Sequence, residues 1–350
     1  MSENLFFKNK NVLITGGTGS IGSEVLKRLT SLPVKKITIF SRDEYKQYQL
    51  RYLYRNSPVT IEYILGDVRD SEALSFASRD TDILFHCSAF KHVPQSEEMP
   101  EEFIKTNVLG SVNVKKAALT NKISTVVSIS SDKAVNPSNT MGLTKALQEK
   151  IFSSYSLQKN SIENQRFVNV RFGNVIGTKG SLFPILYHQI KNNEPITVTD
   201  PSMTRFFMTK SDAIDLIFWS GINGENGQTI IKKMKAVAIG TLIKIYLLVL
   251  SQSENYPIEK IGLRVGEKKH ESLITEDELY KVKSKKNFYL INPYTEVELE
   301  KNILLSSTKE LRKSMDEFNS ECKDNHFSDK EIDLLIRDYI LSVKDQHQFI

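Results

Sequence analysis

Three consecutive residues of this 350-residue chain, Ser131, Asp132 and Lys133, place a hydroxyl, a carboxylate and an amine side by side. They follow the short apolar run at 125–129, which predicts a buried β-strand. A carboxyl group and a lysine at one strand end can supply the acid and the base for proton transfer. A second lysine, Lys145, opens the helix expected next. We therefore expect reaction chemistry at this strand end.

A glycine-punctuated turn near the N-terminus predicts a second kind of chemistry, the binding of a phosphate. Gly16, Gly19 and Gly22 follow the apolar run at 12–14. In such a strand–turn–helix pattern the first glycine allows a tight turn, the second lets the backbone approach a pyrophosphate, and the third lets the helix pack against the strand. The helix N-terminus then faces the bound anion. The predicted dinucleotide contacts here are Gly16, Thr18, Gly19, Ser20, Ile21 and Gly22.

The end of the second expected strand, 37–40, selects the cofactor. An NAD site usually has an acidic residue here that binds the ribose 2′-hydroxyl, whereas this chain has Ser41 and Arg42, with Lys46 one helical turn later. A hydroxyl and two cations favour a 2′-phosphate, so we predict NADP. Asp43 would serve a ribose, and NAD, if the strand ended a residue or two later.

The ends of the next two strands, 61–65 and 83–85, carry further candidates. Asp67 either accepts a hydrogen bond from the adenine amino group or caps a helix, and both remain open. Lys91 follows the later strand and is expected to face an anionic substrate. His92 comes next; a structural role is usual for a lone histidine, and contact with substrate is the alternative. The remaining predicted cofactor contacts are Val68, Ser88, Ala89 and Asn107.

Short β-rich runs alternate with longer helical patterns through the first half of the chain. This alternation predicts an α/β fold with a doubly wound parallel sheet of the Rossmann type, covered by helices on both faces. After about Asn174 the alternation loosens, which predicts a smaller, mixed α/β substrate-binding domain. The expected helices are near 45–54, 71–77, 101–118, 141–157, 239–250 and 329–341. The expected division is 1–174 with a returning segment near 207–224, and 175–206 with 225–350.

Composition excludes several classes of protein. The formal net charge is +5 and the basic residues are interspersed with acidic ones, so nucleic-acid binding is not expected. Cys87 and Cys322 are the two cysteines, which indicates a reducing compartment and structural thiols. The N-terminus shows no secretory signal, and the apolar stretch at 239–250 is too short for a bilayer. We expect a cytoplasmic protein without membrane or metal sites.

Longer strings resemble one family. They are Ser131-Asp132-Lys133, Asn136-Pro137 and Met141-Gly142-x-x-Lys145, followed by the runs at 171–175, 199–208 and 262–271. The resemblance covers nearly the whole chain. It is to the extended, nucleotide-sugar-modifying form of the short-chain dehydrogenase/reductase superfamily and, within it, to the bacterial UDP-N-acetylglucosamine 4,6-dehydratases of surface-glycan pathways.

The resemblance implies roles for individual residues. The superfamily carries Tyr-x-x-x-Lys, in which the lysine binds the nicotinamide ribose and the tyrosine exchanges a proton. Lys145 matches the lysine, but Met141 stands at the tyrosine position, and a thioether cannot exchange a proton. Some UDP-N-acetylglucosamine 4,6-dehydratases have methionine there. The family also implies a homo-oligomer, and it implies that Asn174, Arg205 and Arg264 help to hold the nucleotide diphosphate. With Lys91 and Glu267, these are the expected substrate-binding residues.

The implied reaction is an intramolecular redox elimination on UDP-N-acetylglucosamine. Hydride leaves C4 of the sugar for NADP+, Lys133 removes the C5 proton, Asp132 protonates the departing 6-hydroxyl, and the hydride returns to C6. Asp132, through Ser131 or a water, is the expected acceptor of the 4-hydroxyl proton. Lys133 must first lose its own proton, so we expect Lys145 and the oxidised nicotinamide to lower its pKa by like-charge repulsion.

Two other functions fit the same residues. The first is a nucleotide-sugar epimerase, acting at C4, or at C5 or C3 after dehydration. The second is a catalytically silent nucleotide-sugar-binding protein, which the missing tyrosine permits. Retention of Asp132, Lys133 and Lys145 favours an active enzyme over a decayed site.

Overall fold

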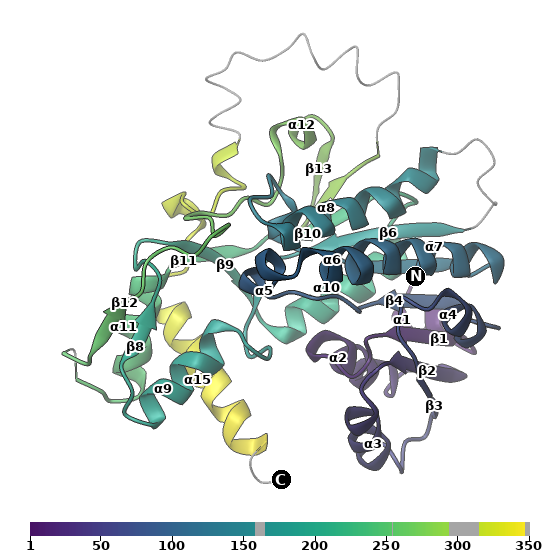
Figure 1. Cartoon of the computed structure of the whole chain (residues 1–350), viewed down its shortest axis with the longest axis horizontal. Helices are drawn as coiled ribbons and strands as arrows, with labels where there is room; N and C mark the ends of the chain where they lie inside the picture. The colour runs from purple at the N-terminus through teal and green to yellow at the C-terminus, as the bar shows by residue number, and fades with distance from the viewer. Residues whose placement is uncertain (158–164, 254, 294–314, 347–350) are drawn as a thin grey trace.

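The computed structural model describes residues 1–157, 165–253, 255–293 and 315–346. Within them, the strands of the main sheet are β1 (Asn11–Thr15), β2 (Lys36–Ser41), β3 (Thr60–Leu65), β4 (Ile83–His86), β5 (Thr125–Ile129), β6 (Arg166–Arg171), β10 (Thr229–Lys232), β13 (Val282–Lys285) and β14 (Phe288–Ile291). Their order is β13-β14-β10-β6-β5-β4-β1-β2-β3 (Figure 1). All pairs from β3 to β10 are parallel, and the two pairs involving β14 are antiparallel. The predicted doubly wound α/β fold is confirmed.

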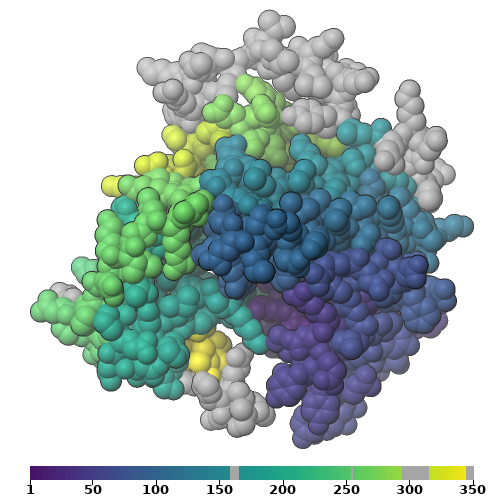
Figure 2. All heavy atoms as spheres, viewed as in Figure 1, coloured from purple at the N-terminus to yellow at the C-terminus, as the bar shows by residue number. Residues whose placement is uncertain are grey.

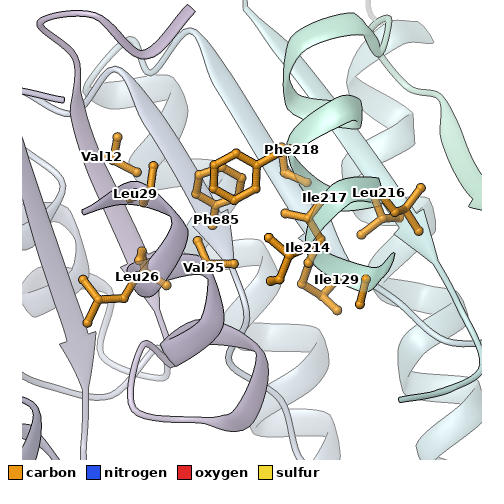
Figure 3. Packing of buried hydrophobic residues seen from close by; sticks show 14 of the residues in the cluster. Val12, Val25, Leu26, Leu29, Phe85, Ile129, Ile214, Leu216, Ile217 and Phe218 are labelled. Carbon is orange, nitrogen blue, oxygen red and sulfur yellow. The ribbon is translucent and has the colours of Figure 1, made fainter. Parts of the chain in front are cut away.

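Helices cover both faces of this sheet. They are α1 (Glu3–Phe7), α2 (Ser20–Leu29), α3 (Glu44–Leu53), α4 (Ser71–Ala77), α7 (Gly110–Thr120), α8 (Thr140–Ser153) and α10 (Lys210–Asn223). On one face Leu26 of α2 and Phe218 of α10 pack with Phe85 of β4 (Figure 3). On the other face Leu74 of α4 and Phe152 of α8 belong to a second apolar cluster. Because both faces are buried, the strands read as continuous apolar runs.

Smaller sheets and three helices form a separate layer of the molecule. The elements are β7 (Asn174–Val175), β8 (Ile196–Val198), α9 (Leu182–Lys191), β9 (Thr204–Met208), β11 (Lys235–Ala238), α11 (Ile239–Val249), β12 (Ile258–Lys260) and α15 (Asp329–Gln346). Strands β11, β9 and β7 form one sheet, and β12 pairs with β8. The ring of Phe183 on α9 meets Tyr246 of α11 and Tyr339 of α15 edge to face, at centroid distances of 5.7 and 5.5 Å. The buried helix predicted at 239–250 is confirmed as α11.

The helix predicted over 101–118 is divided. The short elements of the structure are α5 (Val93–Glu98), α6 (Pro100–Phe103), the π-helical η1 (Ile104–Leu109), the 3-10 turns η2 (Asp132–Ala134), η3 (Ser154–Leu157) and η4 (Lys323–Asn325), and α12 (Glu276–Leu279). The π-helical turn separates α6 from α7 and buries Thr106 and Asn107. A π-helical turn of this kind often marks a functional site.

The large sheet takes up segments from the C-terminal half. Strand β10 pairs with β6, and β14 pairs with β10, although the predicted division places 225–350 in the second domain. Helix α10 returns to the large sheet and packs on β5 and β6. We propose the same two-domain division with 229–232 and 282–291 added to the first domain. Figure 2 shows the purple and blue N-terminal half facing the teal and green half, with the surface hollowed between them.

Candidate active site

The glycine turn between β1 and α2 has the geometry of a phosphate cradle. Gly16 adopts φ +67°, and a Cβ on it would lie 2.8 Å from the backbone nitrogen of Ser88. A Cβ on Gly22 would lie 2.4 Å from the carbonyl oxygen of Gly16. Gly19 caps α2 without a side chain, so the first amide groups of the helix have no side-chain acceptor. The residues present therefore fit a dinucleotide pyrophosphate. Thr18, Ile21, Ser88 and Ala89 are partly exposed at this turn or directly after β4.

The end of β2 gathers charges at the expected cofactor-selecting position. The strand ends at Ser41, whose buried hydroxyl accepts a hydrogen bond from Gln47 Nε2 at 3.1 Å. Asp43 caps α3 through the backbone nitrogen of Lys46 and forms an ion pair with the Lys46 ammonium. Arg42 is the more available cation, since its side chain is half exposed, with its guanidinium carbon 4.6 Å from the centroid of the Phe90 ring.

Asp67 belongs to a cluster with two arginines. Its carboxylate accepts from the backbone nitrogen of Arg69 at 3.0 Å and from the Arg69 guanidinium at 2.8 Å, and lies 3.5 Å from Arg42. Burial opposes ionisation, but the hydrogen bonds and charges of the arginines prevail, so the pKa of Asp67 is lowered. The helix-cap alternative is wrong, because Asp70 caps α4. Val68 is buried against Gly110 beneath this cluster.

A loop from the second layer crosses the cofactor side of the molecule. The backbone nitrogen of Lys179 donates to Ser20 Oγ at 3.3 Å, at the first residue of α2. The carbonyl oxygen of Lys179 accepts from Lys91 Nζ at 2.6 Å. A Cβ on Gly180 would lie 2.8 Å from the His92 ring, so His92 packs against this loop. The loop joins the end of β4 to the phosphate cradle, and sequence patterns did not single out Lys179.

Asn107 lies under the loop that follows β4. Its amide accepts from the backbone nitrogen of Phe90 at 2.8 Å and donates to the Phe90 carbonyl oxygen at 3.0 Å. It also donates to the hydroxyl of Thr144 on α8 at 3.0 Å. The predicted cofactor residue thus fixes the backbone of the β4 loop to α8, and it is fully buried.

The turn after β5 holds the predicted catalytic group. Ser131 Oγ donates to Asp132 Oδ1 at 2.9 Å, and Lys133 Nζ donates to the same oxygen at 3.0 Å. Lys133 Nζ also donates to Asn174 Oδ1 at 3.3 Å, which brings β7 to the site. Asp132 is fully buried, and its Oδ2 has no hydrogen-bond partner. A Cβ on Gly173 would lie 3.2 Å from that oxygen. A buried carboxylate oxygen without a hydrogen-bond partner is rare in proteins and points to a functional role for Asp132.

The pKa of Lys133 is shifted upward, whereas the sequence predicts a downward shift. Burial favours the neutral amine, but the carboxylates of Asp132 and Glu271 outweigh burial, so the pKa of Lys133 is raised. The prediction that Lys145 lowers this pKa is wrong. The ammonium of Lys145 bonds to the carbonyl oxygen of Ile129, and Arg205 is the cation that opposes protonation of Lys133.

Helix α8 presents its buried face to the turn. Met141 is buried at the position where the superfamily has tyrosine. Lys145 Nζ donates to the carbonyl oxygen of Ile129 and to Gln148 Oε1, both at 2.7 Å. Burial lowers the pKa of Lys145 to about 8. Gly142 allows the close approach, since a Cβ there would lie 2.3 Å from the Lys133 carbonyl oxygen.

Three of the predicted nucleotide-sugar residues, Arg205, Arg264 and Glu267, lie on β9 and on the loop 262–270. Arg205 on β9 is buried and donates to the carbonyl oxygens of Thr204, Lys268 and Lys269, with Glu267 3.7 Å away. It therefore holds the 262–270 loop as well as adding positive charge. Arg264 is exposed on that loop.

The same loop contacts α8 and brings in a residue that sequence reasoning missed. Its Gly266 carbonyl accepts from Ser138 Oγ and Asn139 Nδ2, both at 2.8 Å. Glu271, directly after the loop, lies 3.9 Å from Lys133 Nζ. The only sequence signal was its place at the end of the family-like run at 262–271.

Cys87 is partly buried, and desolvation raises the pKa of its thiol to about 12, which suits an unreactive structural thiol. Among the described residues, no group of three or more His, Cys, Asp or Glu side chains is arranged to hold a metal ion. None of the helices in the described ranges is long and apolar enough to cross a bilayer.

Comparison with known proteins identifies the family. Residues 12–293 match the family described as polysaccharide biosynthesis protein. A UDP-glucose 4-epimerase of Rickettsia bellii (strain OSU 85-389) is 42% identical over 289 residues, which are 81% of this chain and 83% of the relative. The chain belongs to the polysaccharide biosynthesis protein family. This membership supports a nucleotide-sugar dehydratase or epimerase and confirms the resemblance found in the sequence.

Solved structures of other proteins agree with the fold. The X-ray structure of Pen from Bacillus thuringiensis superposes with a TM-score of 0.85 at 37% identity, covering 96% of this chain and 99% of Pen. DesIV, a dTDP-glucose 4,6-dehydratase from Streptomyces venezuelae solved with NAD, superposes with a TM-score of 0.65 at 20% identity, covering 73% of this chain and 86% of DesIV. The second likeness shows the fold alone.

Proposed function

We propose that this family member is an NADP-dependent 4,6-dehydratase that converts UDP-N-acetylglucosamine to a UDP-4-keto-6-deoxy-N-acetylhexosamine for surface-glycan biosynthesis. The observation that carries the proposal is the Asp132–Lys133 pair at the end of β5, with Met141 in place of the proton-exchanging tyrosine. A carboxylate with one free oxygen and an adjacent lysine provide an acid and a base without a tyrosine.

The residues divide the work of the elimination. NADP+, when bound, supplies the acceptor for the C4 hydride and returns that hydride to C6. Lys133 removes the C5 proton once it has given up its own, and it returns a proton to C5 as the hydride reaches C6. The 6-hydroxyl leaves as water with the proton that the free oxygen of Asp132 has taken from the 4-hydroxyl. Ser131, bonded to Asp132 Oδ1, provides a path for the 4-hydroxyl proton. Lys145, which matches the lysine of the superfamily motif, would bind the nicotinamide ribose in this proposal.

The cofactor preference rests on Arg42. The Ser41 hydroxyl is bonded to Gln47, and Lys46 is bonded to Asp43. Arg42 is half exposed and pairs with Asp67 at the longer distance of 3.5 Å, so its charge is more available for a 2′-phosphate. We expect Arg42→Ala to weaken binding of NADP by at least about tenfold, since hydrogen bonds to charged groups contribute about 1.5–3 kcal/mol. NAD binding should change little. Equal weakening for both nucleotides would reject this assignment.

The proposed reaction is tested with purified protein, NADP+ and UDP-N-acetylglucosamine in deuterated water, with NMR of the product. Loss of the 6-oxygen, a 4-ketone and deuterium at C5 are expected, and the ring configuration at C5 reports retention or inversion. Lys133→Ala should abolish product, whereas Lys330→Ala, an exposed lysine on α15, serves as the matched control. Turnover by Lys133→Ala at the wild-type rate would refute the mechanism.

A 4-epimerase is the second candidate, favoured by the name of the Rickettsia bellii relative at 42% identity. It predicts UDP-N-acetylgalactosamine, or UDP-galactose from UDP-glucose, with the 6-oxygen retained. Binding of the nucleotide sugar without any turnover would instead support a silent binding protein. The same NMR experiment, run in parallel with UDP-N-acetylglucosamine and with UDP-glucose, separates all three outcomes.

A further inference from the structure

A second buried carboxylate faces Lys133 from a distant part of the chain. Glu271 is 3% exposed, and its Oε1 lies 3.9 Å from Lys133 Nζ. The same ammonium donates to Asp132 Oδ1 at 3.0 Å and to Asn174 Oδ1 at 3.3 Å. Two of its three N–H groups are thus bonded, and the ammonium lies between two carboxylates.

Hydrogen bonds hold both the backbone and one carboxylate oxygen of Glu271. Its backbone nitrogen donates to Ser320 Oγ at 2.8 Å, and its carbonyl oxygen accepts from the Ser320 backbone nitrogen at 2.9 Å. Its Oε2 accepts from Lys268 Nζ at 3.2 Å, and Lys268 also donates to the carbonyl oxygen of Val135 at 2.6 Å. Lys268 therefore ties Glu271 to the segment that follows Lys133. One carboxylate oxygen is paired with Lys268, and the other faces Lys133.

Four charged groups act on Lys133 from the elements around it. Asp132 and Glu271 favour the ammonium, while Arg205 opposes it. Lys91 is the fourth, since its own pKa is lowered by burial and by the charge of Lys133. Removing Glu271 would leave Lys133 with one carboxylate against two cations and burial. The balance of protonation therefore depends on a residue outside the Asp132–Lys133 turn.

We propose that Glu271 is a positioning residue that holds the Lys133 ammonium opposite Asp132 and sets how readily Lys133 gives up its proton. The claim that Lys133 acts as the base rests on the proposed function, whereas the effect of Glu271 on the lysine does not. The Glu271 carboxylate lies 3.9 Å from the Lys133 ammonium in a buried site, where an opposite charge changes proton affinity strongly.

The experiment measures the lysine directly in the full-length protein. Wild type, Glu271→Gln and Glu321→Gln are labelled with limiting acetic anhydride between pH 7 and 11, and the labelled fraction of Lys133 is read by mass spectrometry. Only the neutral amine reacts. Glu321 is the matched control, because it is exposed and faces His270. We expect the pH midpoint of Lys133 labelling to be about 1 to 2 pH units lower in Glu271→Gln than in wild type, and unchanged in Glu321→Gln. An unchanged titration would overturn the proposal.

Glu271→Asp keeps the charge and guards against a folding defect in Glu271→Gln. Its titration should lie between wild type and Glu271→Gln, because the carboxylate is retained but drawn back by one methylene. A curve for Glu271→Asp at or below that of Glu271→Gln would argue against the role of the charge.

Activity provides the second readout. If Lys133 is the base, the rising limb of kcat/KM against pH should move to lower pH in Glu271→Gln by the amount seen in labelling. A purely structural role would lower kcat without moving the limb. Absence of product from wild type would refute the proposed dehydratase, while the labelling result would still decide the role of Glu271.

Discussion

Replacing Lys145 with methionine is expected to stabilise the fold at neutral pH. Lys145 is 6% exposed, and burial lowers its pKa from 10.5 to about 8. Its ammonium donates to the Ile129 carbonyl oxygen and to Gln148 Oε1. Methionine has a similar length and no charge to desolvate. The Ile129 carbonyl would keep the bond from Gln148 Nε2 at 2.9 Å, so only Gln148 Oε1 loses its donor.

The magnitude follows from the two pKa values. The pKa of Lys145 is about 2.5 pH units lower in folded than in unfolded wild type. This difference corresponds to about 3 kcal/mol of destabilisation of the fold at neutral pH. The hydrogen bond lost in the variant costs about 1 kcal/mol, so a net gain of about 2 kcal/mol is expected at pH 7. Between pH 8 and 10.5 the unfolded chain binds more protons, so wild-type stability rises with pH. The advantage of the variant should therefore vanish and reverse toward pH 10.5.

Urea unfolding at several pH values tests this reasoning. Trp219 is the one tryptophan of the sequence and stacks on Phe288 at a centroid distance of 4.3 Å, so its fluorescence reports loss of the core. Lys27→Met removes a charge from an exposed site on α2 and should change stability by less than about 0.5 kcal/mol at every pH. A variant less stable than wild type at pH 7, or a difference that does not change with pH, would refute the argument.

Two further substitutions probe the frame around the site. Gly142→Ala would place a Cβ 2.3 Å from the Lys133 carbonyl oxygen, so the turn that carries Lys133 must shift. We expect the rate of product formation to fall by about 100-fold. Turnover at the wild-type rate would contradict this packing. Arg171→Met would leave the carboxylates of Glu149 and Glu278 without the buried guanidinium, which now bonds them at 2.6 to 3.0 Å. The free energy of unfolding, measured in urea, should fall by about 3–5 kcal/mol. A fall of less than about 1 kcal/mol would show that the two carboxylates are not left unpaired in the variant.

Local patterns were enough to predict the first half of the fold and the cradle. The alternation of strands and helices reports backbone periodicity, and Gly16 and Gly22 are required by contacts within a few residues along the chain or with the neighbouring strand. The Asp132–Lys133 pair was visible because both residues follow one strand. Asp67 shows the limit of such reading, since the choice of Asp70 as helix cap depends on where α4 begins.

The sequence by itself determined the α/β class, the phosphate cradle and the residues at each strand end, because these depend on short-range spacing. Only the tertiary structure decided that Glu271 faces Lys133, that Lys179 meets Ser20 across 159 positions, and that β10 joins the large sheet. Contacts of this kind leave no periodic signal in the chain. The proton affinity of Lys133 depends on Glu271 and Arg205 as well as on its sequence neighbour Asp132, since electrostatic effects in a buried site depend on distance in space and not on separation in sequence.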